Sequence, residues 1–304
     1  MKIHQAAVDS DVSQQIFTDI FREIYKAGKV PDIVFLRQLL QFTLRKPVTN
    51  FSHFIARLDA LIRDFGFVEA AQIAINELSG GFESAGAEKI PSRGPVIVAS
   101  NHPGTYDGFA LIANMKRDDF KIIVSGIPFF HNLPNASKYL IYSTHDINDR
   151  MQAIRYSIDH LKSGGALLIF PSGRIDPDPA VLPGADKALS LWSRSIIVFM
   201  RKVQEASLVL AITSGVLSKE FTNHFYPRLF QNDHERRRVM EFMQILKQMV
   251  RGKPVSVNPR VSFSNTMKFN SHEVSDFEKM QSQIHQQALA LLQEHQLRYS
   301  LPHF

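Results

Sequence analysis

From Phe82 onward the sequence alternates short β-rich runs with longer stretches of helical periodicity, and this alternation is the strongest constraint on the fold. Such a pattern is typical of a sheet covered by helices. We therefore expect an α/β fold with a mixed, largely parallel sheet. The expected strands are 95–99, 121–125, 139–143, 166–170, 208–213 and 255–263, and the expected helices are 151–161, 186–203, 235–250 and 273–297.

The first eighty residues contain only helical patterns, with apolar side chains at helical spacing in the segments 16–24 and 51–65. Pro31-Asp32 is typical of a helix start, Lys46-Pro47 of a helix end and Asn50 of a cap, so we expect about four helices. The sequence therefore predicts a small helical bundle over residues 1–80 before an α/β domain over residues 81–304.

Composition excludes several kinds of site. The 304 residues include no cysteine, which excludes disulfides, thiolate catalysis and cysteine-based metal sites. A net charge of +6 favours anionic partners without choosing among them, and no groove-reading motif predicts nucleic-acid binding. The sequence has no apolar core of a signal peptide and no run of eighteen apolar residues. We expect a cytoplasmic protein whose membrane contact, if any, is peripheral.

The stretch NHPGTYDG follows the first expected strand and places an aspartate five residues after a histidine. The step Pro103-Gly104 prevents one continuous helix through both residues, so a loop that leads into a helix can bring His102 and Asp107 together. A carboxylate so placed fixes the imidazole tautomer and strengthens the histidine as a base. The alternative is that Asp107 only caps the helix and His102 lines a loop. The stretch alone leaves both interpretations open.

Polar residues also follow two other expected strands. One strand ends in PSGRIDPDP, in which Ser172, Gly173 and Arg174 offer backbone N–H groups and a guanidinium suited to phosphate or carboxylate. The other ends just before His145. Because ligands collect at the ends of strands in α/β sheets, we expect both sets to lie near His102. The alternative is a surface turn and a surface histidine.

Together these segments resemble the four-block pattern of the glycerolipid acyltransferases, which include glycerol-3-phosphate and lysophosphatidate acyltransferases. The resemblance rests on Asn101-His102-x4-Asp107, on Phe170-Pro171-x-Gly173 and on the apolar strand 208–213, and it spans about residues 82–215. The segments IYSTHDIND and PSGRIDPDP are similar to those of the soluble chloroplast-stroma type of glycerol-3-phosphate acyltransferase. That type also has a helical bundle before its catalytic domain.

The resemblance implies an enzyme of phospholipid biosynthesis. It implies transfer of a fatty acyl group from an acyl-CoA or acyl-carrier-protein thioester to a hydroxyl of glycerol 3-phosphate or a lysophospholipid. In that reaction His102 takes the hydroxyl proton and Asp107 orients His102. The resemblance implies no metal, no cofactor beyond the acyl donor and no acyl-enzyme. The alternative is a non-catalytic member of the same fold that binds acyl chains, carrier protein or membrane.

Departures from the stromal type bear on the acceptor. That type binds the acceptor phosphate with a Lys-Lys-His run and two arginines, whereas this chain keeps His145 and Arg174 at the matching places. Thr144 and Asp176 stand where cations are expected, and a carboxylate beside a phosphate weakens binding by charge repulsion. Arg150 is a candidate replacement. The expected acceptor site comprises His145, Arg150, Ser172, Gly173 and Arg174.

The segment 234–253 combines six basic residues with apolar residues at helical spacing. A basic amphipathic helix could lie on anionic lipid, at the inner face of the membrane, or receive an acidic carrier protein. The alternative is a helix that packs its apolar side on the sheet and leaves its basic face in solvent. The only tryptophan, Trp192, is expected in the core.

Overall fold

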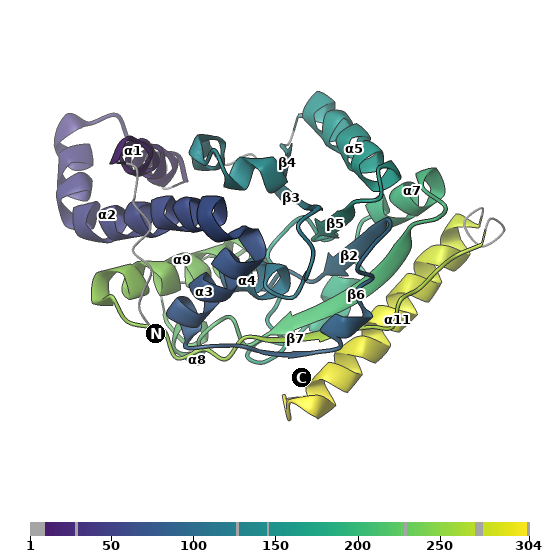
Figure 1. Cartoon of the computed structure of the whole chain (residues 1–304). Helices are drawn as coiled ribbons and strands as arrows, with labels where there is room; N and C mark the ends of the chain where they lie inside the picture. Colours follow the sequence, from purple (N-terminus) through teal and green to yellow (C-terminus); the bar gives the residue numbers. More distant parts are fainter. Residues whose placement is uncertain are drawn as a thin grey trace.

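A seven-stranded sheet covered by helices on both faces forms the centre of the computed structural model, which describes residues 10–27, 30–125, 128–144, 146–225, 227, 230–270 and 276–302 (Figure 1). The strands are β1 (Glu83–Ala85), β2 (Val96–Ser100), β3 (Phe120–Ser125), β4 (Leu140–Ser143), β5 (Ala166–Ile169), β6 (Ser207–Ser214) and β7 (Arg260–Phe263). The helices are α1 (Ser10–Ala27), α2 (Val34–Phe65), α3 (Phe67–Ser79), α4 (Thr105–Ile112), α5 (Ile147–Lys162), α6 (Ala185–Leu189), α7 (Ser195–Lys202), α8 (Lys219–Thr222), α9 (Asp233–Arg251) and α11 (Phe277–Arg298).

The strand order is β1-β7-β6-β2-β5-β3-β4. The five strands from β6 to β4 are mutually parallel, whereas β7 runs antiparallel to β6 and pairs in parallel with β1. The mixed, largely parallel sheet is therefore confirmed. Parallel strands that are covered on both faces need apolar side chains throughout, which explains why β2, β5 and β6 are buried along their whole length.

Alternate residues of the central strands enter two hydrophobic cores. Val96 and Val98 of β2 pack with α1, α2, α3 and α4, whereas Ile97 and Ala99 pack with α5, α7 and α11. The two helical layers lie on opposite sides of the sheet (Figure 1). Phe67 of α3 contacts Phe120 of β3, with 5.8 Å between their ring centroids. The N-terminal helices thus share one hydrophobic core with the sheet.

Among the described residues, the N-terminal region has three helices, not the expected four. Pro47 lies inside the continuous helix α2 and does not end it. A proline in a helix interior costs about 3 kcal/mol, but Pro47 and Val48 are buried, so tertiary packing outweighs this penalty. Asn50 does not act as the expected cap, because its side-chain amide donates a 2.7 Å hydrogen bond to the carbonyl of Met249 in α9.

Two other boundaries differ from the expected ones. The expected helix 186–203 is divided into α6 and α7. Between them the chain turns so that the backbone N–H of Ser193 donates to the carbonyl of Pro171 at 2.9 Å, while Trp192 enters the core as expected. The expected strand 255–263 shortens to β7, which starts directly after Pro259, a residue without a donor for the ladder. Strand β1 was not expected from the sequence.

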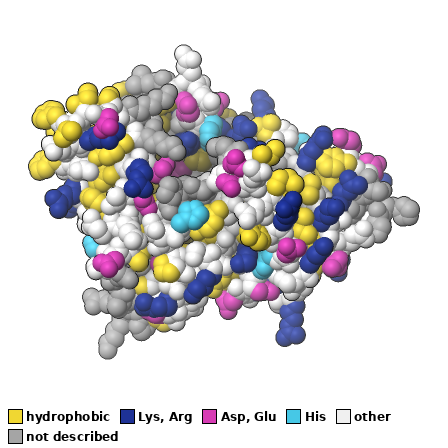
Figure 2. All heavy atoms as spheres, turned by 90° about the horizontal axis from the view of Figure 1, so that it is seen from above, with side chains coloured by type: hydrophobic (Ala, Val, Ile, Leu, Met, Phe, Trp, Pro, Cys, Tyr) yellow, Lys and Arg dark blue, Asp and Glu magenta, His cyan; other side chains and the backbone are white. Residues whose placement is uncertain are grey.

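The large apolar side chains exposed in the N-terminal region lie mainly on the first half of α2. Val34, Phe35, Leu39 and Phe42 are between 48% and 82% exposed, and hydrophobic side chains gather at this end of the molecule (Figure 2). No helix in the described part of the chain is long and apolar enough to cross a membrane. The exposed apolar surface thus includes α2, which the sequence had not marked, in addition to parts of α9.

A buried carboxylate joins the loops that follow β5 and β6. The Asp178 side chain accepts hydrogen bonds of 2.8–2.9 Å from the backbone N–H groups of Gly215, Val216 and Leu217, and one of 2.9 Å from that of Ala180. Because β5 and β6 both pair with β2, this carboxylate ties together the two loops on either side of the end of β2.

We expect Asp178→Asn to lower the free energy of unfolding by about 2–4 kcal/mol, because the new amide NH₂ group faces backbone donors and leaves buried N–H groups unpaired. Urea denaturation measures the change. Asp186→Asn, at an exposed aspartate in the first turn of α6, is the matched control and should change the free energy by less than about 0.5 kcal/mol. Equal stability of the two variants would contradict this role.

Candidate active site

Asn101 extends the ladder of β2 by one residue with its side chain. Its Oδ1 accepts from the backbone N–H of Thr213 in β6 at 2.7 Å, and its Nδ2 donates to the carbonyl of Thr213 at 2.9 Å. The side-chain amide therefore replaces the backbone pairing that would otherwise continue. His102 is the first residue that leaves the sheet, at the carboxyl end of the central strand.

The loop after His102 brings the histidine and the aspartate together. Helix α4 starts at Thr105, which makes Asp107 the third helical residue. One oxygen of Asp107 accepts from the backbone N–H of Gly104 at 3.0 Å and lies 2.9 Å from Nδ1 of His102. Asp107 therefore caps the helix and also binds the imidazole, so both interpretations of the sequence hold at once.

The imidazole of His102 stacks on an aromatic ring and remains partly exposed. The rings of His102 and Phe170 are stacked, with 4.3 Å between their centroids. The side chain of His102 is 29% exposed, whereas that of Asp107 is 0% exposed. Since the carboxylate occupies Nδ1, the tautomer with hydrogen on Nδ1 leaves the lone pair on Nε2 for chemistry.

Opposing effects set the pKa of His102. Burial lowers the pKa, but the charge and hydrogen bond of Asp107, helped by the charges of Glu241 and Asp176, raise it more. The resulting pKa is about 9, compared with an ordinary value of 6.5. His102 is thus a strong base that is mostly protonated at neutral pH when the site is empty of substrate.

Asp176 holds the backbone of His102. The backbone N–H of His102 donates to Asp176 Oδ2 at 3.0 Å, and the backbone N–H of Asp176 donates to the carbonyl of His102 at 2.7 Å. The residue is buried, and burial raises the pKa of the carboxyl to about 6 although the hydrogen bond from His102 lowers it. The expected weakening of phosphate binding by Asp176 stays a prediction.

The loop after β5 forms a tight turn beside His102. The hydroxyl of Ser172 donates to the carbonyl of Arg174 at 2.9 Å, and Gly173 has a φ of +62°, which favours glycine. Both Gly173 and Arg174 are exposed. The Nε of Arg237 in α9 donates to the carbonyl of Ile175 at 2.8 Å. Burial lowers the pKa of Arg237, and the neighbouring charge of Arg174 lowers it further.

One face of α9 is polar and contacts all the loops around His102. Gln244 donates to the carbonyl of Val216 at 2.7 Å and accepts from the N–H of Ser218 at 2.8 Å. Gln248 donates to the carbonyl of Leu78 at 2.8 Å. Other contacts join Arg237 to Ile175, Glu241 to Thr105, and Gln248 to Tyr106.

These α9 residues were missed as site residues in the sequence. Positions 237, 241, 244 and 248 are spaced by four, three and four residues, which places them on one helical face. This spacing could have identified them as one face directed at the site. The basic residues of the segment instead suggested contact with a lipid surface or a carrier protein. The apolar residues of α9 are divided between the core and solvent: Met240 and Met249 are buried, whereas Phe242 and Val250 are about half exposed.

Two residues of the expected acceptor site, His145 and Arg150, belong to the segment after β4. His145 lies outside the described residues. Arg150 is exposed on α5, after a strand that is three positions from β2, roughly 14 Å at ordinary strand spacing. The hydroxyl of Thr144 accepts from the N–H of Asp146 at 3.0 Å and donates to Asp149, so Thr144 helps to begin α5.

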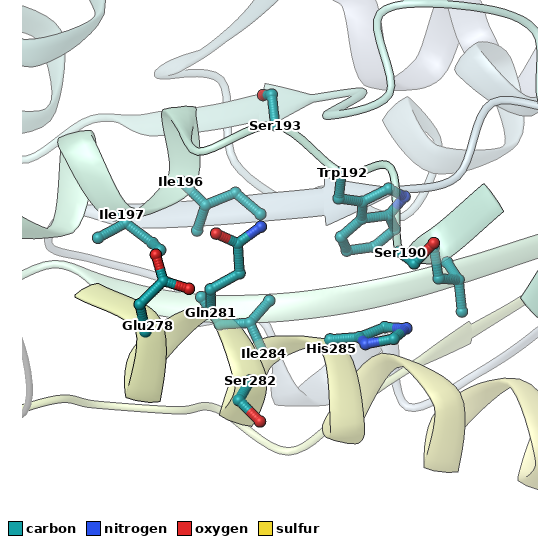
Figure 3. A pocket seen from close by; sticks show the side chains of 11 residues that line it. Ser190, Trp192, Ser193, Ile196, Ile197, Glu278, Gln281, Ser282, Ile284 and His285 are labelled. Atoms are coloured by element: carbon teal, nitrogen blue, oxygen red, sulfur yellow. The ribbon is translucent and has the colours of Figure 1, made fainter. Parts of the chain in front are cut away.

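A separate cavity of about 250 Å³ lies between the α6–α7 segment and α11. Trp192, Gln281 and His285 point toward one another there (Figure 3). Of the described residues that line it, none belongs to the group around His102. Over the described ranges, no cluster of three His, Asp or Glu side chains could hold a metal ion.

The comparison with protein-family models agrees with the sequence pattern. Residues 81–199 match the family model described as Acyltransferase, and this segment includes His102, Asp107 and Arg174. Among solved structures, the chain is similar to the crystal structure of the 1-acyl-sn-glycerophosphate acyltransferase of Thermotoga maritima. The identity is 13% and the TM-score 0.42, over 93% of this chain and 96% of that one. No curated protein matches the chain.

We expect His102 to titrate with a pKa of about 9 in the ligand-free protein, which histidine ring NMR resonances followed against pH would measure. Asp107→Asn removes the main cause of the rise while burial still lowers the pKa, so the pKa should fall toward 6.5. Asp186→Asn, which alters an exposed aspartate, should leave the His102 titration unchanged. A pKa of 6.5 or below in the unaltered protein would contradict this account.

Proposed function

We propose that this chain, which carries an acyltransferase domain at residues 81–199, transfers a fatty acyl group to a hydroxyl of a glycerolipid-type acceptor. The donor is the thioester of coenzyme A or of acyl carrier protein. The observation that carries the proposal is the 2.9 Å contact between His102 Nδ1 and the buried Asp107 carboxylate, with the ring partly exposed at the end of β2. This is the arrangement that general-base catalysis requires.

The geometry supports a direct transfer. Asp107 holds the Nδ1–H of His102, so Nε2 takes the proton from the acceptor hydroxyl as the oxygen attacks the thioester carbonyl. The tetrahedral intermediate then collapses, the C–S bond breaks, and the leaving thiolate takes the proton from Nε2. The products are an ester and a free thiol, and His102 returns to its starting state.

The high pKa of His102 sets the fraction of His102 side chains that are neutral and able to accept a proton. With a pKa of about 9, roughly one His102 side chain in a hundred is neutral at pH 7. The rate should therefore rise about tenfold per pH unit below that pKa, because only neutral His102 accepts the proton. The site combines high basicity with a small active fraction at neutral pH.

The charges beside His102 support an anionic acceptor such as glycerol 3-phosphate or a lysophospholipid. Arg174 is exposed on the turn after β5, and Arg237 reaches the same turn from α9. Two guanidinium groups can bind a phosphate through charge-assisted hydrogen bonds. We propose that Arg237 supplies the second cation that the sequence alone had assigned to Arg150.

We expect His102→Ala to lower kcat/KM for acyl transfer by 10²–10⁴-fold, the usual contribution of a general base, and Asp107→Asn to lower it strongly. The measurement is release of coenzyme A or carrier-protein thiol that depends on an added acceptor. His53→Ala, at an exposed histidine of α2, should retain full activity.

The same assay separates the proposal from a purely binding function. A protein that binds the thioester but releases no thiol in an acceptor-dependent way would be a non-catalytic member of the fold. Near-normal turnover of His102→Ala would refute the assigned base.

We expect Arg174→Gln and Arg237→Gln each to raise KM for phosphate-bearing acceptors about ten- to hundredfold, because each removes a charge-assisted hydrogen bond worth about 1.5–3 kcal/mol. KM for an uncharged monoacylglycerol should change little. Arg238→Gln, at the exposed neighbour of Arg237, is the control. Equal effects on charged and uncharged acceptors would contradict the assignment of a phosphate site.

A further inference from the structure

Two carboxylates hold consecutive backbone amides at the start of α4. The N–H of Gly104 donates to Asp107 at 3.0 Å. The next N–H, that of Thr105, donates to Glu241 of α9, and so does the Thr105 hydroxyl. The two carboxylates come from segments that are 134 residues apart in the sequence (241 minus 107). They meet at the turn between His102 and its partner Asp107.

We propose that Glu241 is a positioning residue for acyl transfer, which holds the start of α4 so that Asp107 stays in contact with His102 and which adds a further negative charge beside the imidazole. This inference rests on the proposed function. Glu241 does not touch the reacting atoms in this account. It acts through Thr105 and through its charge.

The position of Glu241 is fixed by its neighbours on the same face of α9. Arg237, one turn before it, is bound to the carbonyl of Ile175. Gln244, one turn after it, is bound to Val216 and Ser218. Since these contacts anchor α9 on both sides of Glu241, its carboxylate is presented to Thr105 by a rigid support and not by a freely moving side chain.

The charges around His102 come from three elements. Asp107 belongs to α4, Asp176 to the loop after β5, and Glu241 to α9. Arg237 binds the carbonyl of Ile175, next to Arg174 in the chain. Burial raises the pKa of Glu241, and the charge of Asp107 raises it too, whereas the hydrogen bonds of Thr105 and the charge of His102 lower it. The net result is a raised pKa for Glu241, and the hydrogen bonds from Thr105 oppose this rise.

The test compares the pH dependence of kcat/KM for acyl transfer in the unaltered protein and in Glu241→Gln. Glutamine keeps an oxygen that accepts from Thr105 but has no charge. In Glu241→Gln we expect the rising limb of the plot of kcat/KM against pH to move to lower pH. The value of kcat/KM at pH 7, relative to the plateau at high pH, should then rise about three- to tenfold. The plateau itself should fall, because a weaker base transfers the proton less effectively.

Other variants separate charge from structure. Glu241→Asp keeps the charge, so its limb should stay at the original pH even if its plateau falls. Thr105→Val removes one hydrogen bond and keeps the charge, so its limb should not move to lower pH. Glu235→Gln, at an exposed glutamate of the same helix, is the matched control and should reproduce the unaltered profile.

The outcomes also separate this inference from the proposed function. If the unaltered protein shows no acceptor-dependent thiol release, the proposed function fails. If it is active and the limb of Glu241→Gln coincides with its own, the inference is overturned. The NMR titration of His102 in Glu241→Gln gives the same answer without turnover: a lower His102 pKa supports the inference, and an unchanged one overturns it.

Discussion

The contact between His102 Nδ1 and the Asp107 carboxylate is the interaction on which the site depends. It exists because the chain leaves the sheet at one defined residue. Asn101 continues the ladder with its side chain, so His102 projects from the end of β2, and α4 begins three residues later at Thr105. The carboxylate is buried and the imidazole is partly exposed. This difference gives a strong base that is still accessible to a substrate.

The surroundings of this pair come from segments that are far apart in the sequence. Asp176, in the loop after β5, accepts a hydrogen bond from the His102 backbone. Asp178, two residues later, accepts hydrogen bonds from the loop after β6. Helix α9 then crosses these loops and binds each of them through its polar face. The proposed base, Arg237 and Glu241 are thus held by contacts between elements, as precise positioning of catalytic groups requires.

Sequence patterns predicted the strands that carry the site because apolar runs report burial directly. The strands at the centre of the sheet agree with the observed ones to within two residues. Predictions failed where packing outweighed a local preference. Pro47 remained inside α2, and the apolar segment 186–203 was divided so that Ser193 could bind Pro171. Local signals could not show these outcomes, since the deciding partners lie in other elements.

The sequence by itself determined the central strands and identified His102 and Asp107 as a candidate pair, because both depend on residues within one strand, one turn and one helix. The tertiary structure alone decided which other charges reach that pair. Glu241 and Arg237 have the spacing of a helical face, but a polar face fits solvent, lipid or protein equally well from sequence. Likewise, the sequence shows Asp176 only as an acidic residue in a loop, whereas the structure shows it buried against the His102 backbone. Long-range packing selects the partner of each polar group, and no local pattern encodes that selection.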